Sequence, residues 1–522
     1  MAEARPVDLL SAYAARHPEK LALVEDLPGH APRTWSYAAL ERDANRLANA
    51  LLGLGIRPGD KVVWCGLNSS GVVCMVHAAR KLGVTAVPLN YRLTAEEAAY
   101  VVDDSDAVAV YADAEFAALF AEVRGCVPKL REVVIFGGAA LAGQRALEPL
   151  LEKASAEPPQ IEPAEASGET MIYTSGTTGR PKGALRSTAG DPEQILAMLT
   201  FVGYEPDDVY LTTGPLYHSG PGGFMNLAYS LGNTVVVQRK FDPEDWLRLV
   251  QQYRVTTTFS APTPIRMLCH LSPEVKAKYD CGSMKRMIAN AAPWSLALKE
   301  QYLADFPEDS LFEIYGSTEL GVNTILRPED QRRKPGSCGK PSPGVSIALF
   351  DDGGEEITEP NVPGELYVKS KSMFSAYHKA KEKFESGRRG DWLSVGDVAY
   401  RDAEGYYYIC DRKSDMIISG GMNVYPAEVE AALEGHPAVA DVAVFGIPSE
   451  DWGESVHAVV ATHLGETLSE GELIAFARGH LAGYKLPRSV SFTDEIPRTA
   501  SGKILKRLLR APFWKGHGSQ LL

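Results

Sequence analysis

The hydrophobic positions of the chain fall into short apolar runs that alternate with amphipathic stretches. Between Ser36 and Gly53 apolar residues recur every three or four positions, which predicts an amphipathic helix with Ser36 as its N-cap. Residues 61–65 (KVVWC) are apolar at nearly every position, as in a strand that is buried on both faces. Further strands are predicted at 84–89, 108–111 and 133–136. This alternation predicts a parallel sheet with helices on its faces.

The alternation resumes after a polar, Pro- and Glu-rich segment, residues 152–168, which we expect to be an exposed connector. Beyond it, strands with helical stretches between them are predicted at 170–173, 209–213, 234–238, 256–260, 284–289 and 311–314. We therefore predict two doubly wound sheets that follow one another in the sequence.

From residue 335 the pattern changes to short strands between turn signals, with strands expected at 346–350 and 364–369. This change indicates a small β-rich subdomain. A last α/β unit follows residue 411, with a helix over 426–434 and strands over 439–445 and 456–462. We predict an N-terminal domain over residues 1–411 and a C-terminal domain over residues 412–522.

Composition narrows the class of protein. A chain of 522 residues is too long for one ordinary core, and a net charge of −14 argues against nucleic acid as the main partner. Seven scattered cysteines without a CxxC pair favour reduced thiols in a cytoplasmic protein. No apolar run approaches about 20 residues, so we expect no membrane-spanning segment, and residues 1–20 lack the pattern of a signal peptide.

Charge is uneven along the chain. Residues 478–522 contain nine Lys or Arg against two Asp or Glu. Such a basic tail is either a solvated surface or a segment that contacts polyphosphate.

One loop concentrates polar chemistry: residues 173–183 read YTSGTTGRPKG directly after a predicted strand. Glycines allow backbone N–H groups to point inward, hydroxyls add donors, and Lys182 adds a positive charge, which together suit phosphate oxygens. The spacing differs from GxxxxGK[ST], because Lys182 does not follow a glycine. A Ser/Thr/Gly-rich surface loop is the simpler alternative, and eleven ordered positions argue against it.

This loop resembles the signature loop of the adenylate-forming superfamily, which contains acyl-CoA synthetases, peptide-synthetase adenylation domains and beetle luciferases. The resemblance implies a large N-terminal domain of two doubly wound α/β subdomains plus a small β-rich subdomain, and a small mobile α+β C-terminal domain. It also implies that the loop binds the phosphates of ATP through Thr174, Ser175, Gly176, Thr177, Thr178, Gly179 and Lys182.

Two further motifs match the same family. Residues 315–319 (YGSTE) imply, by resemblance, that Tyr315 stacks on adenine, Thr318 contacts the α-phosphate and Glu319 ligates Mg²⁺. Residues 394–397 (SVGD) are similar to the family's ribose motif, which implies that Asp397 accepts both ribose hydroxyls. Arg412 resembles the arginine that contacts the ribose at the domain boundary.

The basic tail carries a fourth motif. Residues 497–503 (PRTASGK) resemble the family's C-terminal catalytic loop, with Lys503 as the catalytic lysine. Residues 419–426 (SGGMNVYP) resemble the glycine-rich tunnel segment, where Gly420 and Gly421 leave room for a pantetheine arm. In the family the C-terminal domain rotates between the two half-reactions, and the pivot residue, usually Asp or Lys, falls on Ser414 here.

The resemblance implies an AMP-forming acyl-CoA ligase that uses ATP, Mg²⁺ and coenzyme A. Residues 215–220 (PLYHSG) resemble the segment beside the acyl pocket, with His218 near the carboxylate. Residues 215–226 contain no aspartate for an ammonium group, which disfavours an amino-acid substrate. The small apolar run at 220–227 favours an extended acyl chain, so a medium- or long-chain fatty acid is our first expectation.

Several alternatives stay open. The acid can be an aromatic, alicyclic or steroid or bile-acid carboxylate. The acceptor can be a separate carrier protein, since the nineteen residues after Lys503 are too few for a fused one. A non-catalytic nucleotide binder is disfavoured because four charged motif residues occur together: Lys182, Glu319, Asp397 and Lys503. Asn290 and Ala291 replace glycines of a family segment near the adenine and acyl pockets. We expect small-molecule partners, and the sequence leaves a homodimer open.

Overall fold

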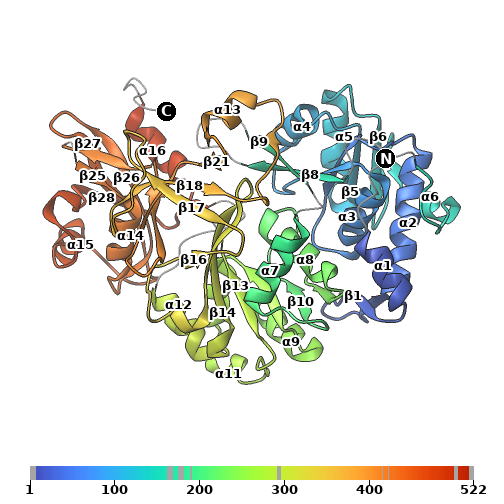
Figure 1. Ribbon diagram of the computed structural model, residues 1–522, viewed down its shortest axis with the longest axis horizontal. Helices are drawn as coiled ribbons and strands as arrows, with labels where there is room; N and C mark the ends of the chain where they lie inside the picture. The colour runs from blue at the N-terminus through green and yellow to red at the C-terminus, as the bar shows by residue number, and fades with distance from the viewer. Residues whose placement is uncertain are drawn as a thin grey trace.

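The chain is arranged around four β-sheets (Figure 1). A computed structural model describes residues 8–161, 168–174, 181–187, 191–290, 296–413, 415–420, 422–498 and 504–515. The N-terminal half forms the right side of the view in Figure 1, and the last sheet, with its helices, lies at the opposite end.

The largest sheet of the described chain has nine strands, six of which pair with a parallel neighbour. Its central strands are apolar along nearly their whole length because helices cover both faces. In spatial order the strands are β16 (Lys340–Pro341), β15 (Gly321–Leu326), β14 (Leu311–Ser317), β13 (Arg286–Ala289), β12 (Thr257–Ser260), β10 (Val209–Thr212), β11 (Thr234–Val237), β1 (Leu21–Glu25) and β2 (Arg33–Ser36).

The second sheet has eight strands within the described residues and is parallel from β8 to β7. The antiparallel strands β9 and β19 form its other edge. In spatial order the strands are β19 (Ala376–Tyr377), β9 (Lys182–Ser187), β8 (Glu169–Thr174), β4 (Thr85–Pro88), β3 (Lys61–Cys65), β5 (Ala109–Asp113), β6 (Glu132–Phe136) and β7 (Arg145–Ala146).

Helices and these two sheets stack in alternating layers. The middle layer contains α2 (Tyr37–Gly53), α3 (Ser70–Leu82) and α8 (Ser219–Ser230), whose apolar residues share one core with the inner faces of both sheets. The outer face of the nine-stranded sheet packs on α9 (Pro243–Tyr253), α10 (Pro262–Cys269) and α12 (Leu296–Asp305). The outer face of the eight-stranded sheet packs on α4 (Ala95–Asp104) and α5 (Ala117–Cys126).

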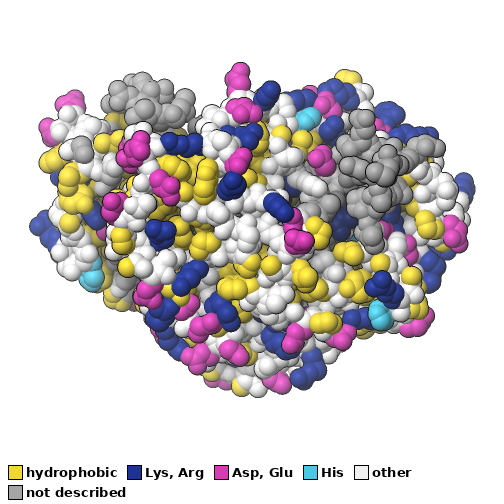
Figure 2. All heavy atoms as spheres, in the orientation of Figure 1, with side chains coloured by type: hydrophobic (Ala, Val, Ile, Leu, Met, Phe, Trp, Pro, Cys, Tyr) yellow, Lys and Arg dark blue, Asp and Glu magenta, His cyan; other side chains and the backbone are white. Residues whose placement is uncertain are grey.

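Smaller helices complete the N-terminal part: α1 (Leu9–Arg16), α6 (Glu148–Lys153), α7 (Pro192–Val202), α11 (Pro273–Lys276) and α13 (Lys381–Ser386). The predicted N-cap of α2 is confirmed, because the Ser36 hydroxyl accepts the backbone N–H of Ala39 at 3.3 Å. No helix among the described residues is long and apolar enough to cross a bilayer. Figure 2 shows acidic and basic side chains interspersed over one face of the molecule.

The prediction of α/β subdomains with parallel sheets is confirmed, but the two sheets do not follow one another in the sequence. Strand β1 lies beside β11 in the nine-stranded sheet, with Leu23 opposite Val235. Strands β8 and β9 instead close the eight-stranded sheet. Apolar periodicity predicts each strand but carries no information on its partner, and for this reason the expected sheet order was wrong.

The β-rich subdomain is confirmed as a six-stranded sheet within the described residues. Its strands are β17 (Ser346–Phe350), β18 (Gly364–Lys369), β20 (Arg388–Arg389), β21 (Trp392–Leu393), β22 (Asp397–Arg401) and β23 (Tyr407–Arg412). The two strands predicted there, residues 346–350 and 364–369, have the predicted bounds.

The last α/β unit contains a five-stranded sheet. Its strands are β24 (Ile417–Ser419), β25 (Met422–Val424), β26 (Val439–Ser449), β27 (Gly453–Thr462) and β28 (Ser489–Phe492). Its helices are α14 (Pro426–Glu434), α15 (Glu470–Ala477) and α16 (Lys506–Trp514). The chain changes sheet between Arg412, the last residue of β23, and Ile417, the first of β24. The predicted boundary between residues 411 and 412 lies next to this change and stays a proposal.

A close backbone approach at Gly339 joins the nine-stranded and six-stranded sheets. The Tyr407 N–H donates to the Gly339 carbonyl at 2.9 Å, and the Cys338 N–H donates to the Tyr407 carbonyl at 2.9 Å. Gly339 has a φ of +96°, and a Cβ there would overlap the backbone of Ile325 and Leu326. Only glycine combines ready access to a positive φ with the absence of a Cβ, and both are needed at this position.

We expect Gly339→Ala to lower the free energy of unfolding of the N-terminal part by about 3–5 kcal/mol, the sum of left-handed strain and steric overlap. Gly336→Ala is the matched control, because Gly336 has a φ of +78° and open space around its Cβ position. It should cost about 1–2 kcal/mol. Guanidinium unfolding followed by fluorescence measures both, and equal losses would show that the overlap at Gly339 is relieved at no cost.

Candidate active site

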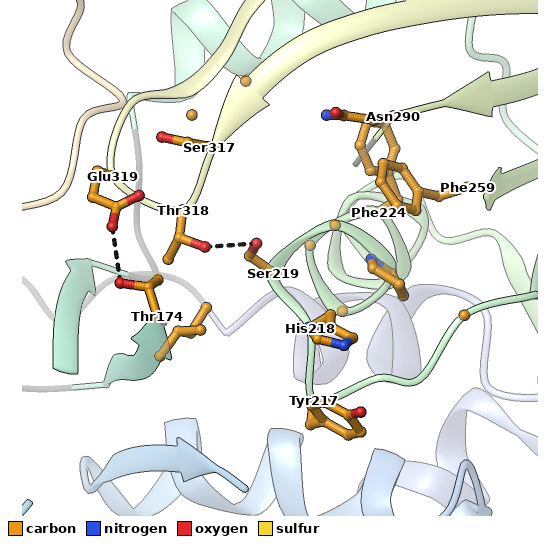
Figure 3. Close-up of a pocket in the computed structure, with 18 of the residues that line it drawn as sticks. Thr174, Tyr217, His218, Ser219, Phe224, Phe259, Asn290, Ser317, Thr318 and Glu319 are labelled. Atoms are coloured by element: carbon orange, nitrogen blue, oxygen red, sulfur yellow. Dashed lines mark hydrogen bonds between the residues drawn. The ribbon is translucent and has the colours of Figure 1, made fainter. Parts of the chain in front are cut away.

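A cavity of about 3420 Å³ lies at the carboxyl ends of the parallel strands and extends between the N-terminal part and the C-terminal unit. It is lined by residues of both large sheets, of the six-stranded sheet and of α14 and α16. Open parallel sheets bind ligands at this edge. The separated sequence motifs therefore converge on one space, part of which Figure 3 shows.

The Glu319 carboxylate is fixed by two hydroxyls from the eight-stranded sheet. Thr174, at the end of β8, donates to Glu319 Oε1 at 3.0 Å (Figure 3). Tyr377 of β19 donates to the same oxygen at 3.0 Å. Glu319 itself follows β14 of the nine-stranded sheet and is 8% exposed. Burial and the neighbouring Glu319 carboxylate raise the pKa of Tyr377, so its hydroxyl stays protonated and remains a donor.

Thr318 is held by hydrogen bonds at its side chain and at its backbone carbonyl. Its hydroxyl shares a hydrogen bond of 2.9 Å with the hydroxyl of Ser219, the first residue of α8 (Figure 3). The Arg186 guanidinium of β9 donates to the Thr318 carbonyl and, at 2.7 Å, to the Ser372 carbonyl. The backbone that carries Thr318 and Glu319 is therefore held by a half-buried cation from the other sheet.

Tyr315 and Asp397 are paired, which connects the nine-stranded and six-stranded sheets. The Tyr315 hydroxyl donates to Asp397 Oδ2 at 2.6 Å, and the Arg412 Nε lies 3.4 Å from Asp397 Oδ1. Burial and the Asp397 carboxylate raise the pKa of Tyr315. Asp397 is 7% exposed and also lines the cavity. Three residues predicted for adenine and ribose thus form one cluster.

Of the other predicted residues, Lys182 is described by the structure, and several more are not. Lys182 begins β9 opposite Thr174 in the strand register and lines the cavity. The loop between these two residues is not described, and neither are several further predicted positions. The predicted positions outside the described residues are Ser175, Gly176, Thr177, Thr178, Gly179, Ala291, Ser414, Gly421 and Lys503.

The C-terminal unit lines the cavity with residues that flank one of its two motifs. Arg498 and Ile504, which flank the undescribed residues 499–503, both line it. Gly420 in the β24–β25 hairpin is not among the lining residues. Its N–H donates to the Trp452 carbonyl at 2.8 Å, and a Cβ at Gly420 would lie 2.7 Å from the Trp452 ring. The structure therefore does not bring Gly420 to the site.

His218 directly precedes α8 and is half-buried beside Tyr217 (Figure 3). The Asn68 side-chain oxygen accepts the Leu216 N–H at 2.9 Å and so fixes this segment. Burial, with a smaller effect of the Arg92 charge, lowers the pKa of His218 to about 4, so the imidazole is neutral at pH 7. Its Nε2 is buried without a hydrogen-bond partner among the described residues.

The glycines of α8 have different surroundings. A Cβ at Gly220 would overlap the Phe259 ring, and a Cβ at Gly222 would lie 2.7 Å from the Leu216 carbonyl oxygen. Gly223 has nothing within 4 Å of its Cβ position. Phe259 stacks on Phe224 at 5.1 Å (Figure 3). Two of the small residues therefore serve close packing, and only Gly223 leaves open space.

The donor set suits a nucleotide-bound Mg²⁺. No group of three or more His, Cys, Asp or Glu side chains in the described part of the chain could hold a metal by itself. Mg²⁺ in nucleotide sites is instead bound by one or two carboxylates together with substrate phosphates. Glu319 provides one carboxylate, with Oε1 held by two hydroxyls. Its Oε2 accepts no hydrogen bond from a described residue.

Sequence reasoning missed Tyr377, Arg186 and Ser219. Arg186 lies on the same face of β9 as Lys182, so strand alternation could have indicated it. Ser219 directly follows His218 in a motif that was recognised. Tyr377 lies 58 residues after Glu319, and no local signal in the sequence connects the two.

Comparison with known proteins yields two family matches and close full-length relatives. The family described as AMP-binding enzyme matches residues 10–378, and the AMP-binding enzyme C-terminal domain matches residues 428–503. The fatty acid–[acyl-carrier-protein] ligase ScoC of Streptomyces coeruleorubidus is 32% identical over 95% of this chain and 98% of its own. A feruloyl-CoA synthase of an Amycolatopsis species is 36% identical over 93% of this chain and 95% of its own.

A solved structure agrees with these matches. The o-succinylbenzoate CoA synthetase MenE of Bacillus subtilis, in complex with its acyl-adenylate intermediate, superposes with a TM-score of 0.83 at 31% identity. The similarity covers 96% of this chain and 97% of that one. The same enzyme has been solved in complex with ATP and a magnesium ion.

We expect Tyr377→Phe to raise the Mg²⁺ concentration needed for half-maximal activity about tenfold, because Glu319 loses one of its two hydroxyl donors. Rates of AMP formation at fixed ATP and varied Mg²⁺ measure this. Tyr400→Phe is the control, since Tyr400 stacks on Tyr408 at 4.7 Å and does not line the cavity. An unchanged Mg²⁺ dependence in Tyr377→Phe would contradict the predicted metal contact of Glu319.

Proposed function

The chain belongs to the AMP-binding enzyme family, and from this premise we propose that it is an AMP-forming acyl-CoA ligase for an extended, largely hydrophobic carboxylic acid. One observation carries the proposal: the motif residues predicted for phosphate, metal, adenine and ribose meet in a single cavity. These residues are Thr174, Lys182, Tyr315, Thr318, Glu319, Asp397 and Arg412.

The first half-reaction joins two anions. A carboxylate with a pKa near 4 is already ionised at pH 7 and needs no general base. One of its oxygens attacks the α-phosphorus of ATP, the bond to the β-phosphate breaks, and pyrophosphate leaves. The obstacle is charge repulsion, which positive groups reduce. We propose Lys503 for the incoming carboxylate and the α-phosphate, and Lys182 for the pyrophosphate side.

Mg²⁺, when bound, would neutralise phosphate charge and orient the phosphates. We propose that Glu319 binds it, in an orientation that Thr174 and Tyr377 maintain. Asp397 would accept the ribose hydroxyls while Tyr315 and Arg412 hold its carboxylate. The N–H groups that open α8 have no side-chain cap, so they would favour negative charge near Thr318.

In the second half-reaction a thiolate attacks the acyl carbon and AMP leaves. A thiol pKa of about 8.5 supplies some thiolate near neutral pH without a dedicated base. Arg498 and Ile504, the described residues on either side of residues 499–503, line the cavity, whereas Gly420 does not. This arrangement suits the first half-reaction, and we propose that the C-terminal unit rotates to present the hairpin with Gly420 and Gly421 for the second.

The side of the cavity along α8 supports an extended acyl group. Apolar residues from α7, α8 and β12 line it: Met198, Leu199, Phe224, Leu227 and Phe259. His218 is neutral beside the first turn of α8, so it can approach a carboxylate as a hydrogen-bonding group without adding charge. A medium- or long-chain fatty acid is our first choice, and aromatic, alicyclic or steroid acids are the alternatives.

A second candidate is transfer to a carrier protein. It is favoured by the 32% identity to a ligase whose name specifies an acyl carrier protein as acceptor. We further propose a cytoplasmic location, which is supported by seven cysteines that are all free.

The proposed function is tested by pyrophosphate release from ATP across a panel of carboxylic acids, with and without coenzyme A. We expect turnover to rise at least tenfold with coenzyme A and to peak at one acid. Release that coenzyme A does not stimulate would favour a carrier-protein acceptor. No release with any acid would contradict ligase activity.

Lys503→Ala should slow acyl-adenylate formation by at least about 100-fold while it preserves most transfer from supplied acyl-adenylate to coenzyme A, because the lysine stabilises charge only in the first step. Lys515→Ala, at an exposed position of the same tail, is the control. Single-turnover assays of each half-reaction measure the two effects. An equal loss in both half-reactions of a folded variant would refute this division of roles.

A further inference from the structure

A second polar cluster lies at the far end of α8, away from the phosphate-binding residues. Ser219 opens the helix beside Thr318, and Figure 3 shows Ser219 and Phe224 along it. Tyr229 follows ten residues after Ser219, which corresponds to about 15 Å along the helix axis at 1.5 Å per residue. Both Ser219 and Tyr229 line the same cavity. The cavity therefore reaches from the reaction centre to the end of α8.

The cluster contains two buried polar atoms without partners. The Tyr229 ring lies edge-on to the His77 ring of α3, with centroids 4.7 Å apart, and each residue is 2% exposed. Neither the Tyr229 hydroxyl nor His77 Nε2 has a hydrogen-bond partner among the described residues. Burial, and then the charge of Arg80, lower the pKa of His77 to about 3. His77 is therefore neutral and can donate one hydrogen bond.

Arg80 adds a positive charge at the same place. It lies one helical turn after His77 on α3, is half-buried and lines the cavity. Its guanidinium makes no hydrogen bond or ion pair with any residue that the structure describes. Burial lowers the pKa of Arg80, which reflects the cost of holding this charge away from water.

The negative charge of Asp8 favours the charged form of Arg80, but the two side chains form no hydrogen bond or ion pair in the described part of the chain. Lys81 is paired with Asp8 at 2.5 Å and with Glu41 at 2.7 Å, so these two carboxylates are already engaged. The end of α3 needs no side chain either, because the Gly83 N–H donates to the carbonyls of Ala79 and Arg80. A half-buried guanidinium with five donors and no partner is matched best by a carboxylate.

We infer that the acid substrate carries a second carboxylate about 15 Å from the reacting one, which Arg80 binds with donors from Tyr229 and His77. This inference rests on the proposed function. A fully extended chain advances about 1.2 Å per bond, so the span corresponds to roughly twelve bonds. The substrate class is a medium-chain α,ω-dicarboxylic acid. Its first carboxylate reacts near Thr318, its methylenes follow the apolar wall of α8, and its second carboxylate stays ionised.

The test compares dodecanoic acid with dodecanedioic acid in coenzyme A-dependent AMP formation by the full-length protein. We expect the wild type to prefer the diacid at least tenfold in kcat/KM. Arg80→Met should lower kcat/KM for the diacid about 10- to 100-fold, mainly through KM, because a charge-assisted contact made in both ground and transition states is lost. The loss for dodecanoic acid should be much smaller.

Two further variants separate recognition from stability. Tyr229→Phe removes only a hydroxyl that has no partner, so the fold should persist while the diacid loses about 3- to 10-fold in kcat/KM. Arg46→Met is the matched control, since Arg46 is 45% exposed on α2 and does not line the cavity. It should leave both acids unaffected.

Several results would overturn the inference. If the enzyme turns over dodecanoic acid as well as the diacid, or prefers 12-hydroxydodecanoic acid to the diacid, the substrate has no second carboxylate. The proposed ligase function would then stay intact. Equal losses for mono- and diacid in Arg80→Met and in Tyr229→Phe would assign both residues to stability alone. If no acid of the wider panel supports AMP formation, the proposed function is refuted, and this inference with it.

Discussion

The hydrogen bond from Thr174 to Glu319 is the contact on which the site depends, because it joins the two large sheets at the point where their strands end. Thr174 ends a strand of the eight-stranded sheet, and Glu319 follows a strand of the nine-stranded sheet. Neither side chain could be held in place by its own sheet alone. Tyr377 and Arg186 reinforce the junction from the same edge of the eight-stranded sheet. A shift between the sheets would therefore separate the carboxylate that we propose for Mg²⁺ from the loop that is predicted to bind phosphate.

Helix α8 gives the cavity its direction. It lies between the two sheets, so the space beside it is enclosed over most of its length. Its first turn adjoins Thr318, where negative charge is expected, and its last turn adjoins His77. A ligand along this helix would meet polar groups at both ends and apolar groups between them. Length and end-group chemistry, more than width, should then decide which acid is accepted.

The six-stranded sheet and the C-terminal unit complete the site from the opposite side. Asp397 is held between Tyr315 and Arg412, so the carboxylate that we propose for the ribose belongs to neither large sheet. Arg498 and Ile504 extend the cavity wall from the last unit. We propose that this part of the wall moves between the two half-reactions, because they need different environments at one carbonyl.

The sequence by itself determined the elements, the class of fold and the motif residues. Apolar periodicity predicted β17, β18 and α14 with their bounds, since each depends on local patterns of two or 3.6 residues. The motif at residues 315–319 was likewise readable, because its chemistry lies in consecutive residues. Only the tertiary structure decided which strands are neighbours, that Tyr377 supports Glu319, and that Arg80 lies beside the cavity without a partner among the described residues. These are contacts between residues far apart in the chain, and a linear pattern contains no information about which distant surfaces meet.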